Sequence, residues 1–275
     1  MSASSAGPRK SEPWWAGQRH VLHAEWTKVR TVAGPGWLLI GAVALMAAVG
    51  AIAAHATRCS GRDCQIDPAR VSLTGIYLSQ AIVAILAVTS FSGEYSTGMM
   101  RLTLTAIPRR WHVLSAKAVV TGAATLTAGL VAVAASLVVG RLLLNGHGIT
   151  PAHGYEALSL GTTAVLRAAA GSVLYLVLIA LLGLGVAAAV RDSATSIGVV
   201  LGLLYLFPII TSFVGDHHWQ RHMNQISPMT AGLYITATTN LRSLPLTPWQ
   251  GLGVLAAWAA GALLAGGVLL RVRDA

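Results

Sequence analysis

The sequence predicts an all-α polytopic membrane protein with six transmembrane helices, an interfacial helix before the first of them and a short helix between the second and third. Of its 275 residues, 55% are hydrophobic and only 10% are Asp, Glu, Lys or Arg. A soluble domain carries about 25% charged residues. Six long windows lack these four residue types, and each is close to the roughly 20 apolar residues that a transmembrane helix needs.

The composition also excludes several classes of protein. The mean hydropathy of +0.65 is too high for an ordinary soluble enzyme or for a disordered chain. Two cysteines are too few for a disulfide scaffold or a Cys-rich metal module. The net charge of +10 would suggest nucleic acid in a soluble protein. In a membrane protein it reflects basic residues on the cytoplasmic side, so no nucleic-acid partner is expected.

The chain before the first span divides into two parts. Residues 1–12, rich in Ser, Ala, Gly and Pro, predict a disordered cytoplasmic tail, and residues 13–275 predict a single transmembrane domain. Over about residues 14–33, apolar side chains form one stripe at helical spacing. Tryptophans with flanking basic residues are typical of a helix in the membrane interface. The residues expected to anchor it are Trp15, Leu22, Trp26, Lys28 and Arg30.

The six spans follow in order. The windows cover about residues 37–56, 71–92, 118–140, 168–190, 193–214 and 249–270. They are apolar on every face, whereas strands of a membrane barrel alternate apolar and polar residues. Only Arg191 and Asp192 separate the fourth and fifth windows, so these two helices should form a tight hairpin.

The basic residues predict the orientation of the bundle. Six spans place both termini on one side, and twelve of the nineteen Lys and Arg residues fall on that side. Both termini are therefore expected to be cytoplasmic. The other side holds seven: Arg58, Arg62, Arg70, Arg141, Arg167, Arg221 and Arg242.

The chain lacks the residues typical of a proton-coupled transporter, an ATP-binding protein or an intramembrane protease. No window contains Asp, Glu, Lys or Arg, whereas proton-coupled transporters usually hold such residues inside their spans. The nearest substitutes are His55, expected to be an interfacial residue at the outer edge of the first span, and Gln80 in the second span. Gln80 would either bond to a neighbouring helix or line a substrate path. The chain also has no Gly-x-x-x-x-Gly-Lys-Ser/Thr loop for ATP and no intramembrane protease motif. We therefore expect no enzyme activity, and the energy for any uphill transport must come from another subunit.

The loop of residues 93–110 predicts a docking surface. Gly93 and Gly98 permit sharp backbone changes, and Pro108 ends any helix formed between them. The intervening residues form an amphipathic pattern with Tyr95 and Met99 on one side. Apolar side chains on a cytoplasmic loop indicate contact with a partner.

The outer loops carry two further patterns. Cys59 and Cys64 lie close together and could form a disulfide in an oxidising exterior, which is favoured over free thiols. His218 and His222 have the i, i+4 spacing of zinc ligands on a helix, but no nearby set of ligands completes a site. No metal site is expected.

Three segments resemble one family. Residues 94–101 (EYSTGMMR), followed by Pro108-Arg109-Arg110, resemble the loop after the second span in type-two ATP-binding-cassette export permeases. Residues 23–31 (HAEWTKVRT) are similar to the segment before their first span, and residues 269–275 (LLRVRDA) to their basic C-terminal end. The resemblance covers almost the whole chain, including the number of spans and the side of the termini.

The resemblance implies a permease that pairs with a second copy or paralogue and binds separate cytoplasmic ATPases. Those ATPases would bind ATP and Mg, so no cofactor is expected in this chain. The loop after the second span would form a coupling helix seated on the ATPase. Re-entrant or outer-face helices are implied before the last span. The implied contact residues are Glu94, Tyr95, Gly98, Met99 and Arg101.

Together these observations predict a multi-pass permease of an ATP-driven exporter in a bacterial plasma membrane, surrounded by membrane lipid. The uncharged spans favour a hydrophobic or amphipathic cargo such as a drug, lipid or peptide. The alternative is a membrane scaffold or sensor that transports nothing and recruits a cytoplasmic partner through residues 94–107.

Overall fold

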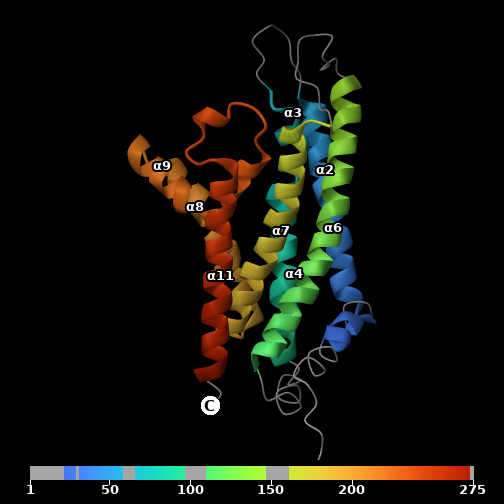
Figure 1. The fold of residues 1–275 in the computed structure, drawn as a ribbon, viewed down its shortest axis with the longest axis vertical. Helices are drawn as coiled ribbons and strands as arrows, with labels where there is room; N and C mark the ends of the chain where they lie inside the picture. Colours follow the sequence, from blue (N-terminus) through green and yellow to red (C-terminus); the bar gives the residue numbers. More distant parts are fainter. Residues whose placement is uncertain (1–21, 29–30, 58–65, 97–109, 147–160, 273–275) are drawn as a thin grey trace, which may run out of the picture.

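The computed structural model describes residues 22–28, 31–57, 66–96, 110–146 and 161–272. Nearly all of these residues are helical, and none of them forms a strand. Among them, six helices are long and apolar enough to cross a membrane. The all-α polytopic fold class is confirmed (Figure 1). The expected tail over residues 1–12 lies outside the described residues.

The six long helices follow the apolar windows with shifted ends. They are α2 (Ala33–Ala56), α4 (Ile76–Ser96), α6 (Arg110–Gly146), α7 (Thr163–Val190), α8 (Ser193–Phe213) and α11 (Pro248–Val272). The largest difference is at α6, which begins well before its window. Lys117, which precedes the third apolar window, therefore lies within a helix.

The second window contains two elements. Its first residues belong to the short helix α3 (Pro68–Ser72) and to the turn that leads into α4. Asp67 caps α3 by accepting a hydrogen bond from Arg70 N (3.1 Å), and Pro68 follows at the first helical position. A Cβ at Gly75 would lie 2.1 Å from Met46 O, so only glycine lets the turn approach α2 this closely.

The helix α7 forms the centre of the bundle and contacts α4, α6, α8 and α11. In the most apolar stretch of α7, 61% of the residues are buried, against 22% in the corresponding stretches of α2 and α8. The contact between α7 and α11 depends on small residues. A Cβ at Gly185 would lie 2.5 Å from Ala262 C, and one at Gly266 would lie 2.6 Å from Gly185 O. Close backbone approach of this kind is the usual basis of helix association in membranes.

The two ends of the bundle differ in content. Residues 22–28, the turn between α7 and α8 and the last turn of α11 lie at one end, which also holds Glu94 and is here called the Glu94 end (Figure 1). The short helices α3 and α9 (His217–Ile226) lie at the other end, here called the α9 end. Both described ends of the chain are thus on the same side.

Short elements fill the chain between α8 and α11. They are α9, α10 (Pro228–Leu233) and the single turns η2 (Tyr234–Thr236) and η3 (Leu241–Ser243). The helix α10 is almost entirely buried. Gln80 Nε2 lies 3.3 Å from Met229 Sδ, and the hydroxyl of Tyr175 donates to Gln80 Oε1. Gln80 therefore bonds neighbouring helices, the first of the two roles considered for it.

Asp67 also ties the α9 end together. Its carboxylate accepts hydrogen bonds from Thr238 N (2.6 Å), Thr238 Oγ1 (2.6 Å) and Thr239 N (3.1 Å). One carboxylate thus caps α3 and holds the segment that follows η2.

Candidate functional site

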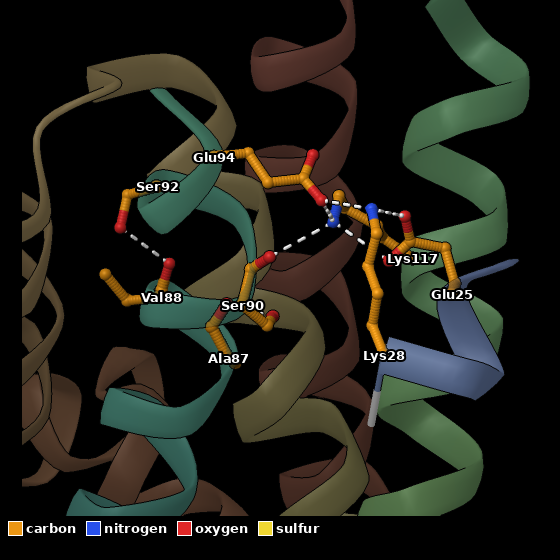
Figure 2. Close-up of polar contacts among 8 residues, drawn as sticks. All are labelled: Glu25, Lys28, Ala87, Val88, Ser90, Ser92, Glu94 and Lys117. Atoms are coloured by element: carbon orange, nitrogen blue, oxygen red, sulfur yellow. Dashed lines mark hydrogen bonds and ion pairs between the residues drawn. The ribbon is translucent and has the colours of Figure 1, made fainter. Parts of the chain in front are cut away.

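Four charged residues from three separate elements meet at the Glu94 end. They are Glu25 and Lys28 from the helical segment 22–28, Glu94 from α4 and Lys117 from α6, and they are called the ion network below. Lys117 Nζ lies 2.9 Å from Glu25 Oε2 and 2.8 Å from Glu94 Oε1. Lys28 Nζ lies 2.9 Å from Glu25 Oε1 and 2.7 Å from Glu94 Oε1. Figure 2 shows the two ammonium groups between the two carboxylates.

The ion network is balanced in charge and mostly buried. The side chains of Lys117, Glu25 and Glu94 are 2%, 9% and 11% exposed, and that of Lys28 is 37% exposed. Lys117 also donates to Ser90 O (3.1 Å), so each of its three N–H groups has an acceptor. Buried ions persist in proteins when they are paired and hydrogen-bonded in this way.

The local structure brings these side chains together. Glu25 and Lys28 are three residues apart and share one face of a helical turn. Ser90 and Glu94 are four residues apart on α4 and likewise share a face. The early start of α6 then places Lys117 opposite both faces.

Electrostatics favours the charged form of Lys28. Burial lowers the pKa of its ammonium, but hydrogen bonds and charge attraction from Glu94 and Glu25 outweigh that effect. The pKa of Lys28 is therefore raised above its ordinary value of 10.5. Lys28 stays charged throughout the neutral range.

Two further cations contact residues that flank segment 97–109. The guanidinium of Arg191 lies over the ring of Tyr95, 5.5 Å from its centroid, and that of Arg271 lies 5.1 Å from the ring centroid of Trp111. Cations over aromatic faces attract the ring quadrupole. Arg191 ends α7 in the left-handed conformation (φ 67°) and donates to Leu269 O (3.3 Å). Tyr95 before segment 97–109 and Trp111 after it therefore each contact a residue from a distant part of the chain.

The structure describes two of the five residues expected to contact the ATPase. Glu94 and Tyr95 turn toward the bundle, where they contact Lys117 and Arg191. Gly98, Met99 and Arg101 lie outside the described residues, as does the coupling helix expected there. Cys59 and Cys64 also lie outside them, so their pairing stays a prediction.

The expected anchors of the interfacial helix lie in different environments. Trp26 is 44% exposed, Leu22 is half-buried and Lys28 belongs to the ion network. Trp15 and Arg30 lie outside the described residues. Segment 22–28 meets α4 and α6 through the ion pairs of Lys28 and Glu25.

Sequence reasoning missed the roles of Glu25 and Lys117. The spacing of Glu25 and Lys28 was visible, but Glu94, which pairs with Lys28, lies 66 positions after it, and Lys117, which pairs with Glu25, lies 92 positions after it. The signal that could have placed Lys117 in a helix is the set of apolar residues that extends α6 before its window, namely Trp111, Val113 and Leu114. No group of three potential metal ligands occurs among the described residues.

Comparison with known proteins gives one finding. The model of the family described as ABC-2 family transporter protein matches residues 65–275. None of the curated proteins compared with the chain matches it.

Proposed function

The chain belongs to the ABC-2 family transporter proteins, and on that premise we propose that it is the membrane subunit of an ATP-driven exporter. Membership makes it the permease component of an ATP-binding-cassette transporter, the part that lacks the ATP-binding site. Its six apolar helices agree with a multi-pass membrane protein. Association with ATP-binding-cassette ATPases is general for the family, and these subunits would bind ATP and Mg.

The ion network is the observation that carries the mechanistic part of the proposal. Segment 97–109 would contact the ATPase. When the ATPase displaces the segment, Glu94 and Lys117 would transmit that displacement to the helices of the bundle. Glu94 and Tyr95 precede the segment, and Trp111 and Lys117 follow it. A push on the segment would thus reach α4 and α6 through the main chain.

The other four spans connect to the same residues through side chains and one main-chain bond. Glu25 and Lys28 bind the network, and Val32 N donates to Lys28 O (2.9 Å) at the start of α2. Arg191 joins the turn between α7 and α8 to Tyr95, and Arg271 joins the end of α11 to Trp111. Ionic and cation–π contacts that cross between helices can move as a unit when one member is displaced.

In this proposal the Glu94 end is cytoplasmic, and the membrane is a bacterial plasma membrane. Both termini would then be cytoplasmic, in agreement with the excess of basic residues on their side. The substrate path would form between two copies of the chain, or between it and a paralogue, as the resemblance implies. Its cargo would be hydrophobic or amphipathic, because the spans offer no charged side chain in their apolar windows.

The test uses the full chain and its partner ATPase, co-expressed and reconstituted in lipid vesicles. Glu25→Gln removes one carboxylate of the network and leaves segment 97–109 and Glu94 intact. We expect the permease to retain the ATPase on purification while its stimulation of ATP hydrolysis falls about fivefold or more, the scale of a typical coupling energy. Export of a fluorescent amphiphile should fall in parallel.

His23→Gln is the matched control, since His23 is exposed on the same helical segment. It should leave both readouts unchanged. Full stimulation in a folded Glu25→Gln protein would contradict the role of the network. Failure of the native protein to retain any ATPase would contradict the exporter itself and favour a scaffold.

A further inference from the structure

An apolar groove of about 700 Å³ lies between α8 and α11, with α7 at its base. Its lining includes Leu182 and Val186 from α7, Val199 and Leu203 from α8, and Gly261 and Ala262 from α11. Since all three helices are candidate spans, the groove lies at membrane depth. Its volume falls within the range of about 300–1,000 Å³ that is common for small-molecule sites.

Polar atoms gather only where the groove meets α9. Trp258 Nε1 donates to Ile226 O (3.0 Å) and joins α11 to the last residue of α9. Gln225, which also lines the groove, donates to Pro245 O (3.2 Å). The groove is therefore apolar along the spans and bounded by fixed polar groups at the α9 end.

The helix α9 is amphipathic and stands away from the bundle (Figure 1). Asp216 caps its start, and no acidic residue lies within it. Arg221 is exposed and lies four residues before Gln225, so its side chain shares the helix face that borders the groove. Trp219 is also exposed, as is usual for tryptophan at the membrane interface.

We propose that the groove and α9 bind one phospholipid with an anionic headgroup, its acyl chain along the groove and its phosphate at Arg221. Because the walls of the groove are membrane-spanning helices, the groove is exposed to the hydrocarbon of the bilayer. A basic side chain above such a groove provides the charge complementarity by which proteins bind anionic headgroups. This inference goes beyond the proposed transport function and does not depend on it, since neither Arg221 nor the lining of the groove includes a residue of the ion network.

The first test fills the groove. A Cβ at Gly261 would meet no atom within 4 Å, so Gly261→Leu can occupy the groove without displacing the bundle. Gly253 lies on the same helix, is equally open and does not line the groove, which makes Gly253→Leu the matched control. The full chain in detergent micelles is titrated with phosphatidylglycerol, and bound lipids are counted by native mass spectrometry.

We expect the native protein and Gly253→Leu to retain one phosphatidylglycerol at low lipid concentration. Gly261→Leu should need about tenfold more lipid, because its side chain takes the place of a few buried methylenes of the acyl chain. Equal binding by Gly261→Leu and the native protein would overturn the proposal. A change in oligomeric state with unchanged lipid binding would also overturn it and assign the groove to a second copy.

The second test concerns the headgroup. Arg221→Gln should reduce the preference for phosphatidylglycerol over phosphatidylcholine about fivefold, the scale of one basic residue near a lipid surface. Arg242 is also exposed at the α9 end but lies on η3, outside the groove lining, so Arg242→Gln is the control. Loss of preference in both variants alike, or in neither, would overturn the assignment of the phosphate to Arg221.

Discussion

At the scale of single residues, burial separates the two lysines of the ion network. Both contact the same two carboxylates, but Lys117 is 2% exposed and Lys28 is 37% exposed. Removing one partner of a buried ion pair leaves an uncompensated charge, which costs far more than the loss of a solvated pair. The two lysines should therefore differ in their effect on stability.

We predict that Lys117→Met lowers the free energy of unfolding by about 3–5 kcal/mol, since two buried carboxylates would then share one ammonium. Lys28→Met should cost about 1 kcal/mol or less, because water screens its contacts. The measurement is unfolding by SDS in mixed micelles, followed by circular dichroism. Similar losses in the two variants would show that burial does not set the strength of the network.

The four residues of the network also show which contacts a sequence does not predict. Each charge was visible, and Glu94 was placed in a functional segment. The pairs between elements were not visible, because they join residues separated by 23 to 92 positions and depend on how three helices pack. Local spacing predicts contacts within a helix, not between helices.

At the scale of helices, the contact between α7 and α11 depends on glycine. Gly185 and Gly266 face each other so closely that an added Cβ would overlap main-chain atoms of the partner helix. Gly202 on α8 has no neighbour within 4 Å of such a Cβ. The same residue type thus has a packing role at one helix and none at another.

Gly185→Leu should destabilise the protein by about 1–3 kcal/mol or more, because a larger side chain forces α7 and α11 apart. Gly202→Leu, the control, should change the free energy of unfolding by no more than about 0.5 kcal/mol. Thermal unfolding in detergent, followed by intrinsic fluorescence, compares the two. An unchanged melting temperature in Gly185→Leu would mean that the helices can separate at little cost.

At the scale of the whole molecule, an even number of spans puts residues 22–28 and the end of α11 on the same side of the membrane. The α9 end, with η3, would then face the opposite side. The ion network and the proposed phosphate site at Arg221 would then lie on opposite sides of the membrane.

Labelling of single cysteines tests this orientation. In a background with Cys59 and Cys64 replaced by serine, Thr27→Cys should react with a membrane-impermeant maleimide only after the cell is opened. Arg242→Cys should react in intact cells. Both positions are exposed in the structure, so their accessibility depends on the membrane alone. The reverse pattern would invert the orientation and place the proposed coupling segment outside.

The sequence by itself determined the fold class and the number of spans, because crossing a membrane requires long uncharged windows that local composition reveals. It also pointed to residues 94–101 through their resemblance to a family, and the match of a family model over residues 65–275 agrees. The tertiary structure decided that Glu94 pairs with Lys117, and that α8 and α11 leave a groove above α7. These features are set by the relative placement of helices far apart in the chain, a placement fixed by packing of side chains and not by the pattern within any one segment.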